Sequence, residues 1–276
     1  MVAQQQERPA VLVAFVAAGL MVCGTGCSGG AAAEDVRSGP STVDTLRQTV
    51  AVLERAGSAK ASTSMEMATG GTRVTIRGQG VYDFKKQTGR LKVLLPQDPA
   101  GTAEHRPITE LLVPGALFMK NRGAGVPADK WVRVATARLT DGNLVTGGAT
   151  DPYAAAELLR GARSVTYVGR TEVAGVPVRH YRGTADLGAA ARDAPEGQRA
   201  ALRAAAKGFA TTAVPFDAYL DDQGRLRKVR HRFSFVNSQR KGTVDVASTL
   251  LLYGFGSPVV VRLPDSSDIY TGKIAE

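Results

Sequence analysis

Residues 72–84, TRVTIRGQGVYDF, alternate apolar and polar side chains, as a β-strand with one buried face requires. The residues on its apolar face are Val74, Ile76, Tyr82 and Phe84. Residues 225–236, RLRKVRHRFSFV, show the same alternation, with Phe233 and Phe235 on the apolar face. Two such segments, far apart in the chain, predict a sheet that buries one face and exposes the other.

Working outward from these two segments, further strands are predicted from alternation and from the turns that bound them. They cover residues 60–68, 90–95, 108–113, 116–121, 131–135, 164–173, 176–186, 214–222 and 243–254, with a short one at 259–262. Most of these strands are joined by short connections, which favour antiparallel pairing. The sequence therefore predicts about ten strands in a largely antiparallel sheet.

Three helices are expected beside this sheet. Residues 42–57 repeat apolar side chains at three- and four-residue spacing, and Asp151 with Pro152 begins a short helix over 151–161. Residues 188–207 are rich in alanine, and Pro195 with Gly197 is expected to divide them into two pieces. The fold class is α+β, a curved sheet packed over two or three helices. Such a sheet encloses either an apolar cavity or an ordinary packed core, and the pattern leaves both open.

Composition excludes several classes of protein. The chain has 276 residues, 43% of them hydrophobic and 22% charged, with a formal net charge of +10. No segment after residue 30 approaches the roughly 18 apolar residues of a membrane-spanning helix. Two cysteines, Cys23 and Cys27, are too few for a disulfide scaffold.

The N-terminus indicates export and lipid attachment. Residues 10–22, AVLVAFVAAGLMV, are continuously apolar, and Gly24-Thr25-Gly26 precede Cys27, which resembles a bacterial lipobox. We expect a signal peptide over 1–26, a lipidated Cys27 with a flexible tether over 27–41, and a folded domain over 42–276. The acyl chains would hold the protein on the extracytoplasmic face of the cell membrane. The alternative is an ordinary secretory signal with an incidental cysteine.

The order of several short motifs resembles a known family. They are Gly80–Phe84, Leu117–Lys120, Trp131–Arg133, Gly169–Val176, Tyr219–Lys228, Tyr253–Val259 and Leu263-Pro264. Together with the lipobox and the first helix, they resemble the LppX/LprAFG-type lipoproteins of actinobacteria, within the wider LolA/LolB-like fold. The resemblance covers roughly residues 42–265. It implies an antiparallel half-barrel that closes over helices and holds lipid acyl chains in a hydrophobic cavity.

The resemblance implies carriage of a lipid or glycolipid across the cell envelope, and it brings no catalytic residues. Our candidates for the cavity lining are Val74, Ile76, Tyr82, Phe84, Phe233 and Phe235. The alternative for these residues is plain core packing. The region 188–207 is a candidate gate for ligand exchange.

The strongest charge feature is the polar face of residues 225–236, which carries Lys228, Arg230 and Arg232. Inside a cell nucleic acid would suit such a patch, but an exported lipoprotein does not meet it, so we expect no nucleic-acid partner. Anionic lipid headgroups are the local alternative, and an ordinary solvated strand face is the other.

No cofactor, metal or enzyme motif is apparent. The patterns HExxH and GxxxxGK[ST] are absent, and His105, His180 and His231 stand alone. We expect structural histidines with satisfied ring nitrogens, no metal site and no catalytic activity. Two further functions stay open: a regulatory lipoprotein that binds an envelope protein partner, and an envelope enzyme acting on a lipid ester.

Overall fold

The computed structural model describes residues 41–69, 72–96, 106–145, 151–237 and 242–272. All of them belong to one compact unit, residues 39–276. Within the described residues, one antiparallel sheet and a set of short helices account for nearly all regular structure.

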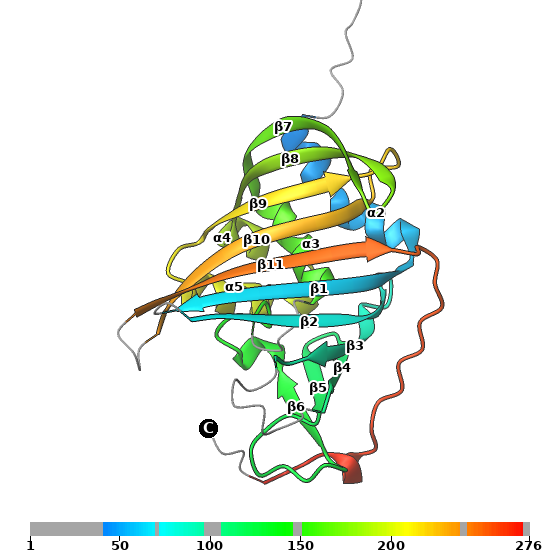
Figure 1. The fold of residues 1–276 in the computed structure, drawn as a ribbon, viewed down its shortest axis with the longest axis vertical. Helices are drawn as coiled ribbons and strands as arrows, with labels where there is room; N and C mark the ends of the chain where they lie inside the picture. Colours follow the sequence, from blue (N-terminus) through cyan, green and yellow to red (C-terminus); the bar gives the residue numbers. More distant parts are fainter. Residues whose placement is uncertain (1–40, 70–71, 97–105, 146–150, 238–241, 273–276) are drawn as a thin grey trace, which may run out of the picture. The chain divides into compact units, whose positions relative to one another are not determined.

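The sheet contains eleven strands in the order β6-β5-β4-β3-β2-β1-β11-β10-β9-β8-β7. Their bounds are β1 Ser58–Thr69, β2 Thr72–Asp83, β3 Thr88–Leu94, β4 Ile108–Val113, β5 Ala116–Lys120, β6 Trp131–Ala135, β7 Ala162–Val173, β8 Val176–Asp186, β9 Ala213–Leu220, β10 Leu226–Asn237 and β11 Gly242–Tyr253. Strands that are consecutive in the chain pair with each other, except β6 and β7, which form the two edges of the sheet, and β11 returns to pair with β1. That pairing joins the N-terminal six strands to the C-terminal five. The sheet is curved and unclosed (Figure 1).

The predicted strands agree with the observed ones to within two residues at each end, apart from the last. Residues 259–262 are irregular, so the prediction of a strand there is wrong. Val259 to Val261 are β-branched, but they follow Pro258 and form no ladder with the sheet. The sheet has eleven strands, slightly more than the predicted number of about ten.

Helices gather on one face of the sheet (Figure 1). They are α1 Thr42–Arg47, α2 Thr49–Ala56, α3 Pro152–Glu157, α4 Leu187–Asp193 and α5 Glu196–Gly208, with 3-10 helices η1 Thr136–Arg138 and η2 Leu158–Gly161. A third 3-10 helix, η3 Ser266–Asp268, lies in the segment that follows β11. Asp151 caps α3 through the backbone N–H groups of Tyr153 and Ala154, and Pro152 occupies the first position, as predicted. Asp186 caps α4 by accepting from the N–H of Ala189.

Five α-helices in the described residues exceed the two or three predicted, because two expected helices are each divided. The helix expected over 42–57 is interrupted at Gln48, which ends α1 and precedes α2. The alanine-rich segment breaks at Ala194 and Pro195, as predicted, while Gly197 lies inside α5. Proline has no backbone N–H and fixes φ, so the helix restarts at that residue.

The main core lies between the inner face of the sheet, which is the face toward the helices, and the helices themselves. Side chains from β1 to β4 and β9 to β11 alternate between this core and the outer face. On β1, Ala59, Ala61 and Met65 are buried in it. Helices α1 and α2 contribute Leu46, Val50 and Leu53, whereas α3 and α4 contribute mostly alanine, including Ala154 to Ala156 and Ala189 to Ala191.

A second, smaller cluster lies on the outer face. Leu111 of β4 with Ala116 and Phe118 of β5 is covered by Val261 and Ile269, which follow β11. We call residues 254–271 the C-terminal strap, which runs from the end of β11 to β6 (Figure 1). It ends in a parallel bridge between Trp131 and Ile269.

Candidate functional site

The residues predicted to line a cavity all lie on the inner face of the sheet. Tyr82 and Phe84 are fully buried, Ile76 and Phe233 nearly so, and Val74 and Phe235 pack against the core from partly exposed positions. Strands β1 and β11 separate β2 from β10, so the two sets flank the middle of the sheet. The sequence therefore located the inner face correctly, while a ligand-binding role for these residues stays a prediction.

Tyr82 connects the sheet to α3. Its ring lies 5.2 Å from that of Phe84 and 6.5 Å from that of Tyr153, measured between centroids. Its hydroxyl donates to the carboxylate of Asp151, which also caps α3. Burial raises the pKa of Asp151, although the hydrogen bonds from Tyr153, Ala154 and Tyr82 oppose that rise. Burial likewise raises the pKa of Tyr82.

A second polar group joins α2 to α3. The hydroxyl of Tyr153 donates to Oε1 of Glu54 over 2.8 Å, and Nε of Arg160 donates to Oε2 of Glu157 over 2.8 Å. Glu157 has no exposed surface, and burial raises its pKa despite Arg160. These contacts hold the α2–α3 pair over one end of the inner face.

Glu110 of β4 is the most unusual of these acidic groups. It shares the inner face with Ile108 and Leu112, has no exposed surface, and neither carboxylate oxygen has a hydrogen-bond partner. Burial raises its pKa to about 8, although the charge of Arg122 opposes the rise. Glu110 is therefore mainly protonated and neutral at pH 7.

The other end of the inner face is aromatic. Phe209, which ends α5, stacks on Phe233 with ring centroids 4.8 Å apart and lies 6.4 Å from Phe235. His231 is buried beside Phe233, and burial lowers its pKa to about 3, so the ring is neutral. Its Nε2 has no hydrogen-bond partner, which corrects the prediction of a satisfied structural histidine at this position. Oγ1 of Thr63 on β1 is buried and unpartnered in the same way.

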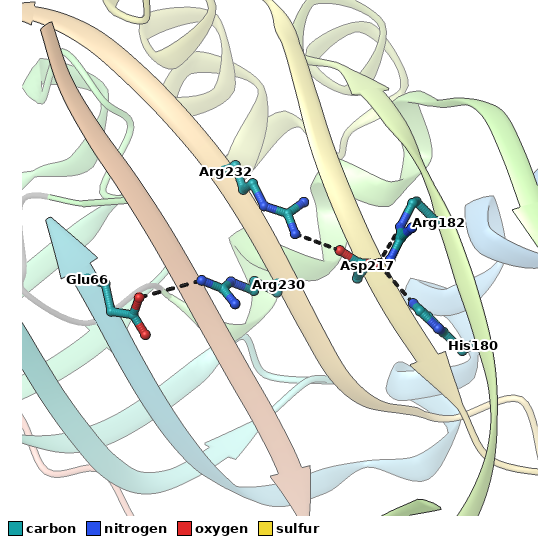
Figure 2. A network of polar contacts seen from close by, with 6 residues as sticks. All are labelled: Glu66, His180, Arg182, Asp217, Arg230 and Arg232. Atoms are coloured by element: carbon teal, nitrogen blue, oxygen red, sulfur yellow. Dashed lines mark hydrogen bonds and ion pairs between the residues drawn. The ribbon is translucent and has the colours of Figure 1, made fainter. Parts of the chain in front are cut away.

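The predicted basic patch lies on the opposite, outer face and is largely paired within the sheet (Figure 2). Arg232 donates from Nη2 to Oδ2 of Asp217 over 3.0 Å, and Nη2 of Arg230 lies 3.5 Å from Oε2 of Glu66. Nζ of Lys228 lies 5.2 Å from the centre of the Tyr219 ring. A headgroup or membrane role for these three cations stays a prediction.

Asp217 is a residue that sequence reasoning missed. Its carboxylate also contacts Nε of Arg182 and Nε2 of His180, each at 2.9 Å. Partial burial raises the pKa of Asp217, but the hydrogen bonds from Arg182, His180 and Arg232 together outweigh it and lower the pKa to about 2. The only signal in the sequence was an aspartate within the apolar run of β9.

The remaining predictions concern the N-terminus and the other histidines. Cys27, the signal peptide and His105 lie outside the described residues. His180, by contrast, is paired with Asp217, as expected of a structural histidine. In the part of the chain that the structure describes, no helix is long and apolar enough to cross a membrane, and no cluster of three or more ligating side chains forms a metal site.

Comparison with known proteins gives matches to solved structures only. No family model and no curated protein sequence matches the chain. LprF from Mycobacterium bovis is 14% identical with a TM-score of 0.43, covering 80% of this chain and 96% of that one. The lipoprotein LppX from Mycobacterium tuberculosis is 12% identical with a TM-score of 0.45, covering 82% and 100%.

A putative outer membrane lipoprotein-sorting protein domain from Vibrio parahaemolyticus is 11% identical with a TM-score of 0.32, covering 78% of this chain and 93% of that one. LprF and LppX are of the type that the sequence motifs resemble. This likeness is one of fold, and it specifies neither a ligand nor a partner.

Proposed function

We propose that this protein is an envelope lipoprotein, anchored through Cys27, that takes a lipid or glycolipid into the interior between the sheet and the helices. The observation that carries the proposal is the inner face itself. It is a wide apolar surface that includes unpartnered polar atoms on Thr63, Glu110 and His231.

Unpaired buried polar groups are costly, about 1–3 kcal/mol each, and are rare in a core that is permanently closed. An amphiphile in the interior supplies both kinds of contact that this face needs. Its acyl chains replace the helix side chains against Phe233 and Phe235, while ester or hydroxyl groups pair with Thr63 and His231. The proposal assigns no catalytic step to the chain.

The helices over this face suit a cover that moves. Alanine makes up most of the buried hydrophobic positions of α3, α4 and α5, and its short side chain contributes little apolar area per residue. The α4–α5 pair includes the predicted gate at 188–207, and its helical run breaks at Ala194 and Pro195. Outward displacement of α5 would uncover Phe233 and Phe235, where Phe209 now stacks.

Lipid retention tests the proposal. The full chain carrying Cys27→Ser, which prevents acylation, is purified from a bacterial membrane fraction and its extractable lipids are measured. Phe233→Asp places a charge on the inner face and is expected to abolish retention. Ser234→Asp places the same charge one residue away, on the outer face, and serves as the control.

A further inference from the structure

A pocket of about 550 Å³ lies on the outer face of the sheet, where the C-terminal strap passes β4 to β6. Its lining includes Arg90, Leu111, Lys120, Trp131, Val260 and Arg262. We call it the strap pocket. None of the sequence motifs singled it out, because its residues come from four strands and the strap.

Strand register brings these side chains together. Arg90 of β3 stands opposite Leu111 of β4, and Lys120 of β5 stands opposite both Thr109 and Trp131. The strap is fastened to β6 beside the pocket, since the N–H of Tyr270 donates to the carbonyl oxygen of Trp131 over 2.8 Å. Nζ of Lys130 donates to the carbonyl oxygen of Ser267 over 3.0 Å. The pocket is therefore part of the folded architecture.

The charges in the strap pocket are all of one sign. Arg90, Lys120 and Arg262 line it, and none of its lining residues is acidic. Among the described residues, none of these three cations forms an ion pair, whereas Arg230 and Arg232 have carboxylate partners. Nζ of Lys120 lies 5.6 Å from the centre of the Trp131 ring. Three like charges that line one pocket favour an anionic ligand that neutralises them.

Apart from Thr109, the rest of the pocket lining is apolar, and its rim is exposed. Val260 is 67% exposed and Leu263, farther along the strap, is 50% exposed. Trp131 is the single tryptophan of the chain. Tryptophan with lysine and arginine is the combination that proteins place at the boundary between bilayer and water.

We propose that the strap pocket binds the phosphate group of an anionic phospholipid and so attaches the outer face of the sheet to a bilayer. Arg90, Lys120 and Arg262 contact the phosphate, while Val260 and Leu263 meet the upper part of the acyl chains. The pocket lies on the opposite face of the sheet from the interior, so the proposal does not depend on lipid entering that interior.

Trp131 makes the site directly observable. The full chain with Cys27→Ser is mixed with vesicles of phosphatidylcholine alone, or of phosphatidylcholine with phosphatidylglycerol, each carrying brominated acyl chains that quench tryptophan. We expect quenching of Trp131 on the vesicles that contain phosphatidylglycerol and little on the others. Equal quenching on both, or none on either, would overturn the proposal.

Variants separate a site from general charge attraction. The double variant Arg90→Gln with Arg262→Gln is expected to raise the lipid concentration needed for half-maximal quenching at least about tenfold. The double variant Arg90→Lys with Arg262→Lys is expected to quench at nearly the wild-type lipid concentration, because it keeps both charges. The matched control is Arg73→Gln with Arg77→Gln, exposed positions on the outer face of β2. An equal loss in the control would contradict a specific pocket.

Glycerol phosphate distinguishes a membrane headgroup from a soluble phosphate ester. If it changes Trp131 emission while vesicles do not quench, the pocket serves a soluble ligand and the proposed bilayer contact is wrong. Quenching by vesicles in a protein that retains no extractable lipid would support the strap pocket while contradicting the interior site.

Discussion

Gly208 of α5 lies so close to Thr140 that a Cβ atom at Gly208 would overlap the carbonyl oxygen of Thr140. A Cβ atom at Gly142 would likewise overlap the carbonyl oxygen of Ala201 on α5. The φ of Gly142 is +60°, a conformation that residues with a side chain rarely adopt. Helix α5 is thus seated by direct backbone contact with residues 139–144. This contact holds the α5 cover down over the inner face.

Gly208→Ala is expected to loosen that cover. The new methyl group forces α5 away from Thr140, which should lower the free energy of unfolding by about 1–3 kcal/mol and speed the release of a fluorescent fatty acid. Gly197→Ala is the control, because Gly197 lies in the same helix and a Cβ atom there meets nothing within 4 Å. Urea denaturation and release kinetics measure both effects. Unchanged release from a destabilised Gly208→Ala protein would show that α5 is not the gate.

Thr63→Val removes a buried hydroxyl that has no partner while keeping the side-chain shape. Without ligand, the variant should be more stable by about 1 kcal/mol, because an unpaired polar group leaves the core. If the hydroxyl pairs with the lipid, retention should fall by about fivefold. Thr249→Val, on the outer face of β11, should change neither quantity. Undiminished lipid retention in Thr63→Val would remove Thr63 from the binding site.

Glu110 should make the protein less stable as the pH rises. Its pKa is about 8 in the folded protein and near 4.3 when unfolded, so the folded state binds more protons between these values. The free energy of unfolding should then fall by up to about 1.4 kcal/mol per pH unit from pH 5 towards pH 8. Glu110→Gln should flatten this part of the profile, and the exposed control Glu172→Gln should not. Parallel profiles for wild type and Glu110→Gln would contradict the assignment.

Asp217 should show the opposite dependence. Its folded pKa of about 2 lies below the unfolded value near 3.9, so its stabilisation is present above pH 4 and lost as the pH falls towards 2. Asp217→Asn should cost about 1–2 kcal/mol at pH 7, and the difference from wild type should shrink in acid. Asp222→Asn, at an exposed ion pair with Arg170, is the comparison. Chemical denaturation at several pH values measures the free energy of unfolding of the wild type and of both variants.

Much of the sheet followed from sequence because its signal is local. Alternation in 72–84 and 225–236 sets which side chains face inward, and turn residues such as Gly175 and Gly224 set where strands end. The helix boundaries at Asp151 and Pro195 followed from equally local backbone preferences. The irregular backbone at 259–262 did not, because tertiary contacts decide whether a β-branched segment joins a sheet.

The sites could not be predicted as readily, because they depend on register between distant strands. Lys228, Arg230 and Arg232 stood out as a run of cations, but their partners Glu66 and Asp217 come from β1 and β9. The strap pocket needs Arg90, Lys120 and Arg262 together, and no local pattern links them. The buried, unpartnered Glu110 appeared in sequence as an ordinary polar residue of a strand.

Native mass spectrometry of the full chain carrying Cys27→Ser, purified from a bacterial membrane fraction, tests lipid binding in the interior most directly. The account predicts a protein mass increased by one or more lipids, which are lost on denaturation and absent from Phe233→Asp. A mass equal to that of the polypeptide alone, unchanged after incubation with envelope lipids, would contradict it and favour the protein-interaction alternative.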